Sequence, residues 1–216
     1  MTALRFGVIG LGQRMAHALR AIKRAGGDFK IAAHYDPEAH GRTILTQENI
    51  AIGAAEDSAQ GVARTKNLDL ILIGSPNHLH LQHLETALAA NIPVFCEKPI
   101  VRTAEESFAL RRRLAQPGTP PVYVGLVLRS APIVRKTLEI AQSGAIGRIV
   151  SIDATEHLPP EHGAYLARNW RRKNAWGGSF LLDKVCHDFD IFNALIGART
   201  ARVASFGGRS IFDDPA

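Results

Sequence analysis

The sequence is poor in cysteine, with two in 216 residues, and it has no run of about eighteen apolar residues. Two cysteines can form at most one bridge, so a disulfide-built scaffold is excluded, and a membrane span is not expected. The N-terminal residues lead directly into a strand-like segment and lack the long apolar core of a signal peptide. These absences lead us to expect a cytoplasmic protein with reduced thiols and no membrane partner.

Concentrated charge is also lacking, because the basic residues behind the net charge of +6 are scattered. The densest groups, 111–113 and 171–173, are not interleaved with aromatic residues as in proteins that bind single strands. We therefore expect no nucleic-acid partner. The apolar content of 46% instead indicates a folded chain with a sizeable core, long enough for one large or two small domains.

Strand-like and helix-like segments alternate through the first part of the chain. Short apolar runs predict strands over 5–9, 30–35, 68–74, 92–96 and 122–128. Helical spacing predicts helices after Gly12, over 79–90 and over 103–114, and the segment 38–66 has room for a helix and a short strand. This alternation predicts an α/β fold, a Rossmann-type doubly wound parallel sheet, over residues 1–127.

After this point the pattern changes, and residues 128–216 are predicted to form a partial second domain of the α+β class. We expect, in chain order, a helix over 133–143, a strand over 148–157, a loop over 159–178, a helix over 179–196 and a strand over 201–206.

The first group with chemical meaning is the glycine-rich junction after the first strand. Gly10 permits a tight turn, and Gly12 lets a pyrophosphate approach the helix N-terminus, where Gln13 and Arg14 follow. Asp36 ends the second strand, where a carboxylate can bind both hydroxyls of an adenosine ribose and repels a 2′-phosphate. The motif predicts a dinucleotide site that prefers NAD to NADP; the alternative is a sharp turn with a turn-forming aspartate.

Three histidines follow the strand 68–74, together with Ser75 and Asn77. In an open parallel sheet, ligands lie beyond the carboxyl ends of the strands, so this segment is expected at the edge of a cleft. His78, His80 and His83 lack the spacing of a zinc site and have no cysteine or carboxylate close in sequence. We expect no metal, and histidines that shape a cleft wall or the solvent face of a helix.

Glu97 and Lys98 end the strand 92–96 at the same cleft edge. A lysine beside the positive ring of a nicotinamide can serve in proton transfer, whereas the alternative is an ordinary surface pair.

The helix 179–196 carries the clearest polar cluster. At about 100° per residue, one arc holds only apolar side chains and the opposite arc holds Asp183, His187 and Asp190. The apolar arc, expected to be buried, comprises Leu181, Val185, Phe189, Phe192 and Ile196. Asp183 and His187 are four residues apart, so the carboxylate can fix the tautomer of the imidazole, as acid–base catalysis requires. The alternative is an amphipathic helix with an exposed pair.

The loop before this helix contains Trp170 and Arg171, ahead of the flexible pair Gly177 and Gly178. Tryptophan and arginine in this setting can line a polar pocket for a substrate, or they can anchor a surface loop.

Taken together, these residues resemble the Gfo/Idh/MocA oxidoreductase family over nearly the whole chain. The motifs occur in the family's order: Gly10-x-Gly12, Asp36, Ser75-Pro76-Asn77-x-x-His80, Glu97-Lys98-Pro99, Gly144-x-Ile146-Gly147-Arg148, Trp170-Arg171, Gly177-Gly178 and Asp183-x-x-x-His187-x-x-Asp190. The resemblance implies a Rossmann domain followed by a domain built on an open sheet. It implies hydride transfer between a nicotinamide and a carbinol carbon, often of a sugar or cyclitol.

Residue roles also follow from the resemblance. It implies that His187 is the acid/base, that Asp183 orients it or the substrate, and that Lys98 bridges the substrate and the nicotinamide ribose, next to a cis Lys98–Pro99 bond. It implies cofactor contacts by Ser75, Asn77, His80, Glu97 and Lys98, and substrate contacts by Trp170, Arg171, Asp183 and His187.

The chain departs from the family pattern in two places. Met15 occupies the third glycine position, so the helix is expected to pack differently against the strand. Similar proteins continue further than residue 216, so we expect an incomplete second sheet, which leaves a homo-oligomer open. We therefore expect an NAD-dependent oxidoreductase of a polyol or sugar, and the alternative is a dinucleotide-binding sensor or inactive homologue without turnover.

Overall fold

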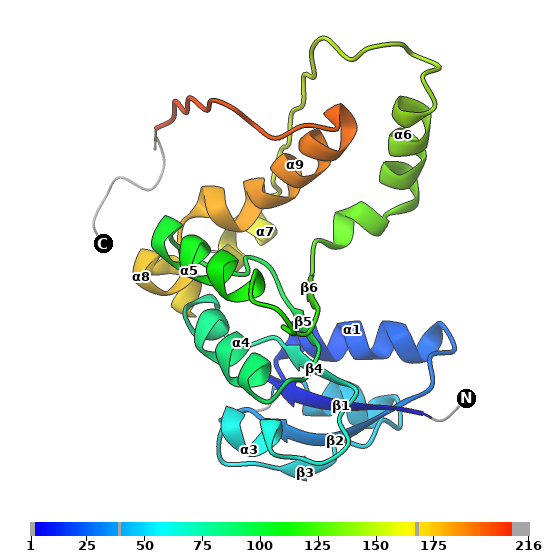
Figure 1. Cartoon of the computed structure of the whole chain (residues 1–216), viewed down its shortest axis with the longest axis vertical. Coiled ribbons are helices and arrows are strands. Elements are labelled where there is room, and N and C mark those ends of the chain that lie inside the picture. Colours follow the sequence, from blue (N-terminus) through cyan, green and yellow to red (C-terminus); the bar gives the residue numbers. More distant parts are fainter. Residues whose placement is uncertain (1–2, 39, 167–168, 209–216) are drawn as a thin grey trace. The chain divides into compact units, whose positions relative to one another are not determined.

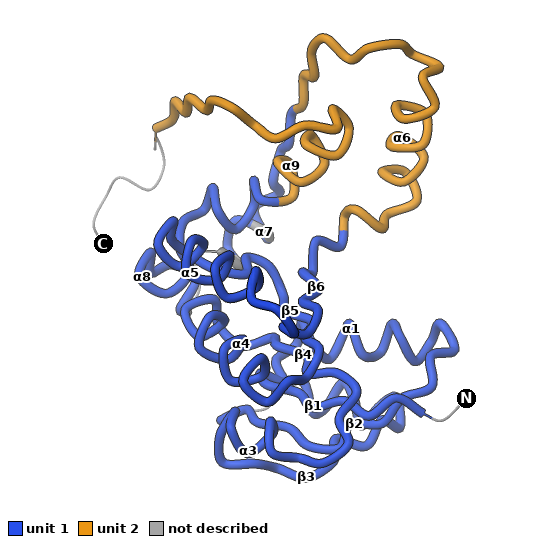
Figure 2. The backbone as a smooth tube through the Cα atoms, viewed as in Figure 1, with its two compact units in different colours: residues 1–127, 155–186 blue, residues 128–154, 187–216 orange. Residues whose placement is uncertain are grey.

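The computed structural model describes residues 3–38, 40–166 and 169–208. The described residues fall into two compact units, one drawn from 1–127 and 155–186 and the other from 128–154 and 187–216 (Figure 2). Residues 155–186 thus group with the first unit although they follow part of the second in sequence. No helix among the described residues is both long and apolar enough to cross a membrane.

The first unit is built on a six-stranded sheet of order β3-β2-β1-β4-β5-β6, in which all paired neighbours are parallel (Figure 1). The strands are β1 (Leu4–Ile9), β2 (Phe29–Tyr35), β3 (Ala54–Ala55), β4 (Leu70–Ile73), β5 (Val94–Cys96) and β6 (Val122–Val124). The helices between them are α1 (Gln13–Arg24), α2 (Arg42–Gln47), α3 (Ala59–Ala63), α4 (His80–Ala89) and α5 (Ala104–Leu114), with the 3₁₀ turn η1 (Asn77–Leu79) before α4. This arrangement confirms the predicted Rossmann-type fold.

Apolar residues cover both faces of the sheet, as a parallel sheet between helices requires. In β1, Phe6 and Val8 face a cluster that includes Met15 and Leu19 of α1, while Ile9 faces the opposite cluster. That second cluster contains buried apolar residues of α3, α4 and α5, among them Val62, Leu84, Leu88 and Leu110. The continuous apolar runs of the sequence are therefore explained by burial on two sides.

Helix α5 begins at a threonine cap. The Thr103 hydroxyl oxygen accepts a hydrogen bond from the Glu106 backbone N–H at 3.2 Å, which satisfies one donor of the first turn. Glu106 also receives the Arg102 guanidinium at 2.5 Å. The sequence therefore fixes the start of this helix correctly.

The remaining helices are α6 (Pro132–Gln142), α7 (Pro160–Leu166), α8 (Asn174–Gly177) and α9 (Phe180–Ile196), with 3₁₀ turns η2 (Val127–Ser130) and η3 (Asn169–Arg172). The predicted loop over 159–178 is thus largely helical. The predicted strand over 122–128 ends at Val124, because the chain turns into η2.

The strands predicted over 148–157 and 201–206 are wrong. Both segments are irregular, and neither pairs with another strand among the described residues. A strand is held by hydrogen bonds to its neighbours, so an alternating pattern without a partner does not produce one. Accordingly, none of the described residues of 128–154 and 187–208 is buried.

Candidate functional site

The turn after β1 brings the backbone of two neighbouring strands together. Gly10 has φ +87°, and its N–H donates to the Tyr35 carbonyl oxygen of β2 at 2.8 Å. A Cβ on Gly10 would lie 2.5 Å from the Gly74 carbonyl carbon and 2.6 Å from the Ser75 Cα, which follow β4. Only glycine fits here, both for its left-handed conformation and for this close approach.

Met15, the residue at the third glycine position, packs into the core with 1% of its surface exposed. It can do so because Gly74 has no side chain: a Cβ there would lie 3.0 Å from the Met15 Cβ and Cε. The helix α1 therefore packs against the sheet at Gly74, with Met15 in place of the third glycine of the motif. This is the different packing that the sequence led us to expect.

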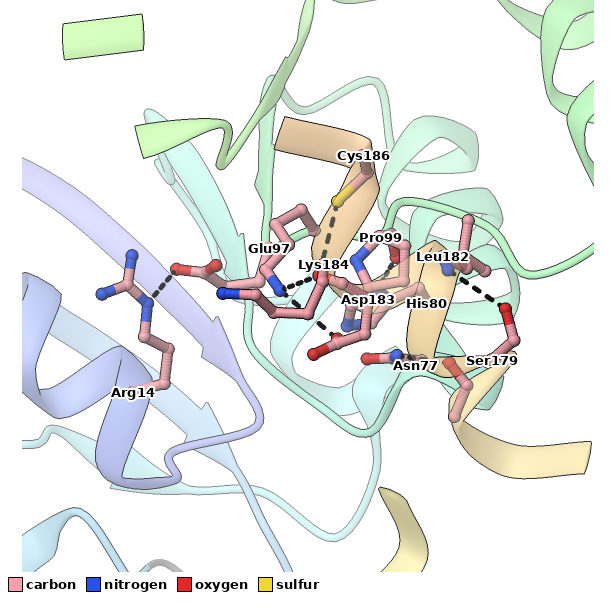
Figure 3. A network of polar contacts seen from close by, with 12 residues as sticks. Arg14, Asn77, His80, Glu97, Pro99, Ser179, Leu182, Asp183, Lys184 and Cys186 are labelled. Carbon is pink, nitrogen blue, oxygen red and sulfur yellow. Dashed lines mark hydrogen bonds and ion pairs between the residues drawn. The ribbon is translucent and has the colours of Figure 1, made fainter. Parts of the chain in front are cut away.

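The N-terminus of α1 is open for an anion. Gly12 is the N-cap, no side chain caps the helix, and a Cβ on Gly12 would meet no atom within 4 Å. Gln13 begins the helix with an exposed side chain. The Arg14 guanidinium donates from Nε to the Glu97 carboxylate at 3.0 Å, with Arg14 half-exposed and Glu97 buried (Figure 3). Backbone donors and a cation thus lie together, as a pyrophosphate site requires.

Asp36 follows the end of β2, as predicted. Its Oδ1 accepts a hydrogen bond from the Glu38 backbone N–H at 2.8 Å, so the residue does form the turn that the alternative interpretation described. A carboxylate has about four acceptor positions, so this bond does not preclude ribose binding.

The segment after β4 forms a buried polar network. The Ser75 hydroxyl lies 2.9 Å from the His83 Nδ1, and the His80 ring nitrogens lie 2.8 Å from the Ser75 and Pro99 carbonyl oxygens. The Asn77 amide donates to the Gly177 carbonyl oxygen at 2.8 Å. The Asn77 and His80 side chains, predicted to contact a cofactor, therefore bind backbone carbonyl oxygens of the protein in this structure.

The burial of His83 leads us to predict that the free energy of unfolding depends on pH. Burial, with smaller repulsion from His80 and His78, lowers the pKa of His83 to about 4. Between about pH 6.5 and about pH 4 the unfolded chain binds a proton that the folded chain does not. The free energy of unfolding should therefore fall as the pH falls through this range, by up to about 3 kcal/mol from this residue.

Urea unfolding at several pH values checks this prediction. His83→Gln should flatten the pH dependence of the free energy of unfolding, whereas His17→Gln, at an exposed histidine, should leave it unchanged. Equal slopes for the parent and His83→Gln would contradict the prediction.

Residues 173–178 dock on the segment after β4. The Trp176 ring stacks on His78 with centroids 4.8 Å apart, and the Arg102 guanidinium donates to the Ala175 carbonyl oxygen. Sequence reasoning missed Arg102; the only signal was its spacing of four residues from Glu106, which also holds it.

Trp170 and Arg171, predicted to contact substrate, lie against each other, with the guanidinium 4.2 Å from the ring centroid.

Lys98 and Asp183, which are 85 residues apart in sequence, come together. The Lys98 Nζ donates to the Asp183 backbone carbonyl oxygen at 2.7 Å and lies 3.3 Å from its Oδ1. Both side chains are largely buried, at 20% and 17% exposed. The Lys98–Pro99 bond is cis, as predicted. Figure 3 shows Asp183 of this contact, together with Glu97, the residue before Lys98 in the chain.

Helix α9 presents its faces differently from the prediction. Leu181 and Ile196 of the apolar arc are more than half exposed, and no residue of the helix is fully buried. The polar arc is the engaged one: Asp183 meets Lys98, and within the second unit Asp190 pairs with Arg129 at 2.7 Å. His187 lies one turn beyond Asp183 on the same helix and belongs to the second unit.

Among the described residues, no group of three histidine, cysteine or carboxylate side chains could hold a metal ion. The first unit contributes backbone donors, the largely buried Lys98 ammonium and the carboxylates of Glu97 and Asp183.

Comparison with known proteins adds the family context. Residues 4–126 match a family model described as an oxidoreductase family with an NAD-binding Rossmann fold, GFO_IDH_MocA, and residues 134–215 match the GFO/IDH/MocA C-terminal domain. Inositol 2-dehydrogenase from Corynebacterium glutamicum is 26% identical over 93% of this chain and 56% of its own. The rhizopine catabolism protein MocA from Rhizobium meliloti is 27% identical over 91% of this chain and 58% of its own.

Solved structures agree on the fold. An oxidoreductase from Thermotoga maritima superposes with a TM-score of 0.73 at 25% identity, over 90% of this chain and 60% of its own. Myo-inositol 2-dehydrogenase from Lactobacillus plantarum superposes with a TM-score of 0.74 at 22% identity, over 91% and 57%. The chain spans little more than half the length of these proteins.

Proposed function

Because the chain belongs to the GFO/IDH/MocA oxidoreductase family, we propose that it binds NAD and takes part in hydride transfer to or from a sugar- or cyclitol-like substrate. The observation that carries this proposal is the pairing of Lys98 with Asp183 in the unit that also holds the glycine turn. The relatives named inositol dehydrogenase and MocA support the substrate class.

The residues of the glycine turn fit a dinucleotide. Gly12 leaves the approach to the helix N-terminus open, and Arg14 adds a cation beside it. These groups would hold the pyrophosphate, and Asp36 would hold the adenosine ribose. NAD, when bound, supplies the acceptor or donor of the hydride.

The residues of the protein would then transfer the proton of the substrate and orient the substrate. His187 would hold or release the proton of the reacting hydroxyl, because an imidazole titrates near neutral pH. Asp183 would orient that imidazole or the substrate. Lys98, already held by Asp183, would donate a hydrogen bond to the substrate oxygen, while Trp170 and Arg171 would contact the rest of the substrate.

Two measurements test the proposal together. NADH binding is followed by fluorescence, and turnover is followed by absorbance of the reduced nicotinamide with a panel of inositols and aldoses. Binding and turnover support the proposal. Binding without turnover on any panel member favours the alternative of a dinucleotide sensor, and absence of binding contradicts both.

Cofactor preference tests Asp36 separately. NAD should bind at least about tenfold more tightly than NADP, a difference of about 1.4 kcal/mol, because the carboxylate repels a 2′-phosphate. Asp36→Asn removes the negative charge while keeping the size of the side chain, so it should reduce this preference. Calorimetric titration of both cofactors measures the ratio, and equal or tighter NADP binding by the parent would refute the role of Asp36.

A further inference from the structure

His80, the first residue of α4, is a buried histidine that contacts two loops at once. The residue is 1% exposed. Nδ1 lies 2.8 Å from the Pro99 carbonyl oxygen, and Nε2 lies 2.8 Å from the Ser75 carbonyl oxygen. Figure 3 shows His80 beside Pro99. The ring therefore links the loops that follow the neighbouring strands β4 and β5.

Both partners of this ring are acceptors, and this restricts its chemical state. A neutral imidazole has one N–H donor and one nitrogen lone pair. If His80 were neutral, that lone pair would face a carbonyl oxygen at 2.8 Å, where two acceptors repel each other. Only the imidazolium, which donates from both nitrogens, satisfies both contacts.

The surroundings of the ring act in both directions. On balance they lower the pKa of His80: burial has the largest effect and repulsion from His78 adds to it, while the hydrogen bonds to the Pro99 and Ser75 carbonyl oxygens raise the pKa. The two acceptors therefore hold the proton against the effect of burial. The pKa values of His78 and His83 are themselves lowered, so near pH 7 both rings are neutral and repel a charged His80 little. The charged groups of the adjoining loop are Glu97, paired with Arg14, Lys98, paired with Asp183, and Arg102, paired with Glu106.

The contact with Pro99 holds the backbone next to Lys98, because Pro99 follows Lys98 in the chain. From this loop position the Lys98 Nζ donates to the Asp183 backbone carbonyl oxygen at 2.7 Å. The contact with Ser75 bears on the glycine turn, because the Ser75 backbone lies against Gly10. The His80 ring thus sets the spacing between the glycine turn and Lys98.

We propose that His80 is a positioning residue, held as an imidazolium, that donates to the Ser75 and Pro99 carbonyl oxygens and so sets the position of Lys98. The inference rests on the proposed function for the importance of Lys98, but its tests do not depend on turnover or dinucleotide binding. Loss of the proton would release one loop, so the position of Lys98 depends on pH.

The protonation state is tested on the unmodified chain by NMR of the histidine ring nitrogens. The range from about pH 5 to about pH 7 brackets ordinary histidine titration. At its acid end both nitrogens of His80 should give protonated-type shifts with slowly exchanging N–H protons, and one of these protons should be lost as the pH rises. The His80 signals are assigned by their absence in His80→Gln. A single neutral tautomer of His80 across the whole range would overturn the proposal.

The positioning role is tested with a matched pair of variants. The amide nitrogen of Asn occupies the place of Nδ1, and that of Gln occupies the place of Nε2. His80→Asn therefore keeps a donor toward Pro99, whereas His80→Gln keeps a donor toward Ser75. A general packing defect would affect both variants alike, but the proposal distinguishes them.

The readout is the rate of reductive methylation of Lys98, measured by peptide mass spectrometry. We expect a several-fold faster rate in His80→Gln and in His80→Phe, and a rate close to the parent in His80→Asn. His83→Leu, which removes a buried ring of the same network that does not contact Pro99, should match the parent. Equal rates in His80→Asn and His80→Gln would overturn the positioning role.

Discussion

Replacement of Gly10 by alanine should prevent this chain from folding stably. The left-handed backbone at φ +87° costs a residue with a Cβ roughly 1–2 kcal/mol. The new methyl would also overlap the backbone of Gly74 and Ser75, which cannot move without displacing β4 from the centre of the sheet. We expect a total loss beyond about 4 kcal/mol, a large part of the stability of a typical domain.

Gly12→Ala is the matched control, because it lies two residues away in the same turn. Its φ is −74°, and its Cβ would meet no atom within 4 Å, so the variant should keep the thermal midpoint of the parent. The methyl would instead occupy the approach of the pyrophosphate to the helix N-terminus. Calorimetry and NADH titration should therefore separate the two variants. A stable Gly10→Ala protein, or a Gly12→Ala protein with unchanged NADH affinity, would contradict this account of the turn.

Replacement of His187 by alanine should remove turnover and leave NAD binding nearly unchanged. Loss of a positioned acid or base typically lowers a rate by about 10²- to 10⁴-fold, or roughly 3 to 5 kcal/mol of barrier. The proposed cofactor contacts of Gly12, Arg14 and Asp36 lie in the first unit, so the affinity for NAD should not follow the rate.

The measurement compares kcat and the NAD dissociation constant for the parent and the variant at saturating substrate. His157→Ala, at an exposed histidine of the irregular segment, serves as the control and should keep parental turnover. Full turnover in His187→Ala would show that another group carries the proton, and Lys98→Met would then be the next variant to measure.

Most of the Rossmann unit could be predicted from local sequence. The strands β1, β2, β4 and β5 coincide closely with apolar runs, because a strand buried on both faces needs apolar residues throughout. The ends of α5 and α9 coincide with a threonine cap and a glycine stop, which act within one turn of the backbone. The short elements α2, β3 and α3 carried too few residues to be placed.

The faces of α9 could not be predicted in the same way. Helical periodicity correctly separated Asp183 from the apolar residues around Leu181, but periodicity does not say which face meets a neighbour. The polar face is the engaged one, because the Lys98 ammonium and the Arg129 guanidinium lie opposite it in their respective units. An ion pair between residues far apart in sequence leaves no local pattern.

By itself, the sequence determined the parallel sheet, the glycine turn and the groups available for chemistry, because these follow from burial periods, backbone freedom and side-chain type. The tertiary structure decided which of those groups meet. In the folded chain Asn77 donates to the Gly177 carbonyl oxygen, His80 contacts carbonyl oxygens of two loops, and Lys98 donates to the Asp183 carbonyl oxygen. These contacts span sequence separations of up to 100 residues. Such contacts arise only when packing brings distant segments together and a buried polar atom must find a partner.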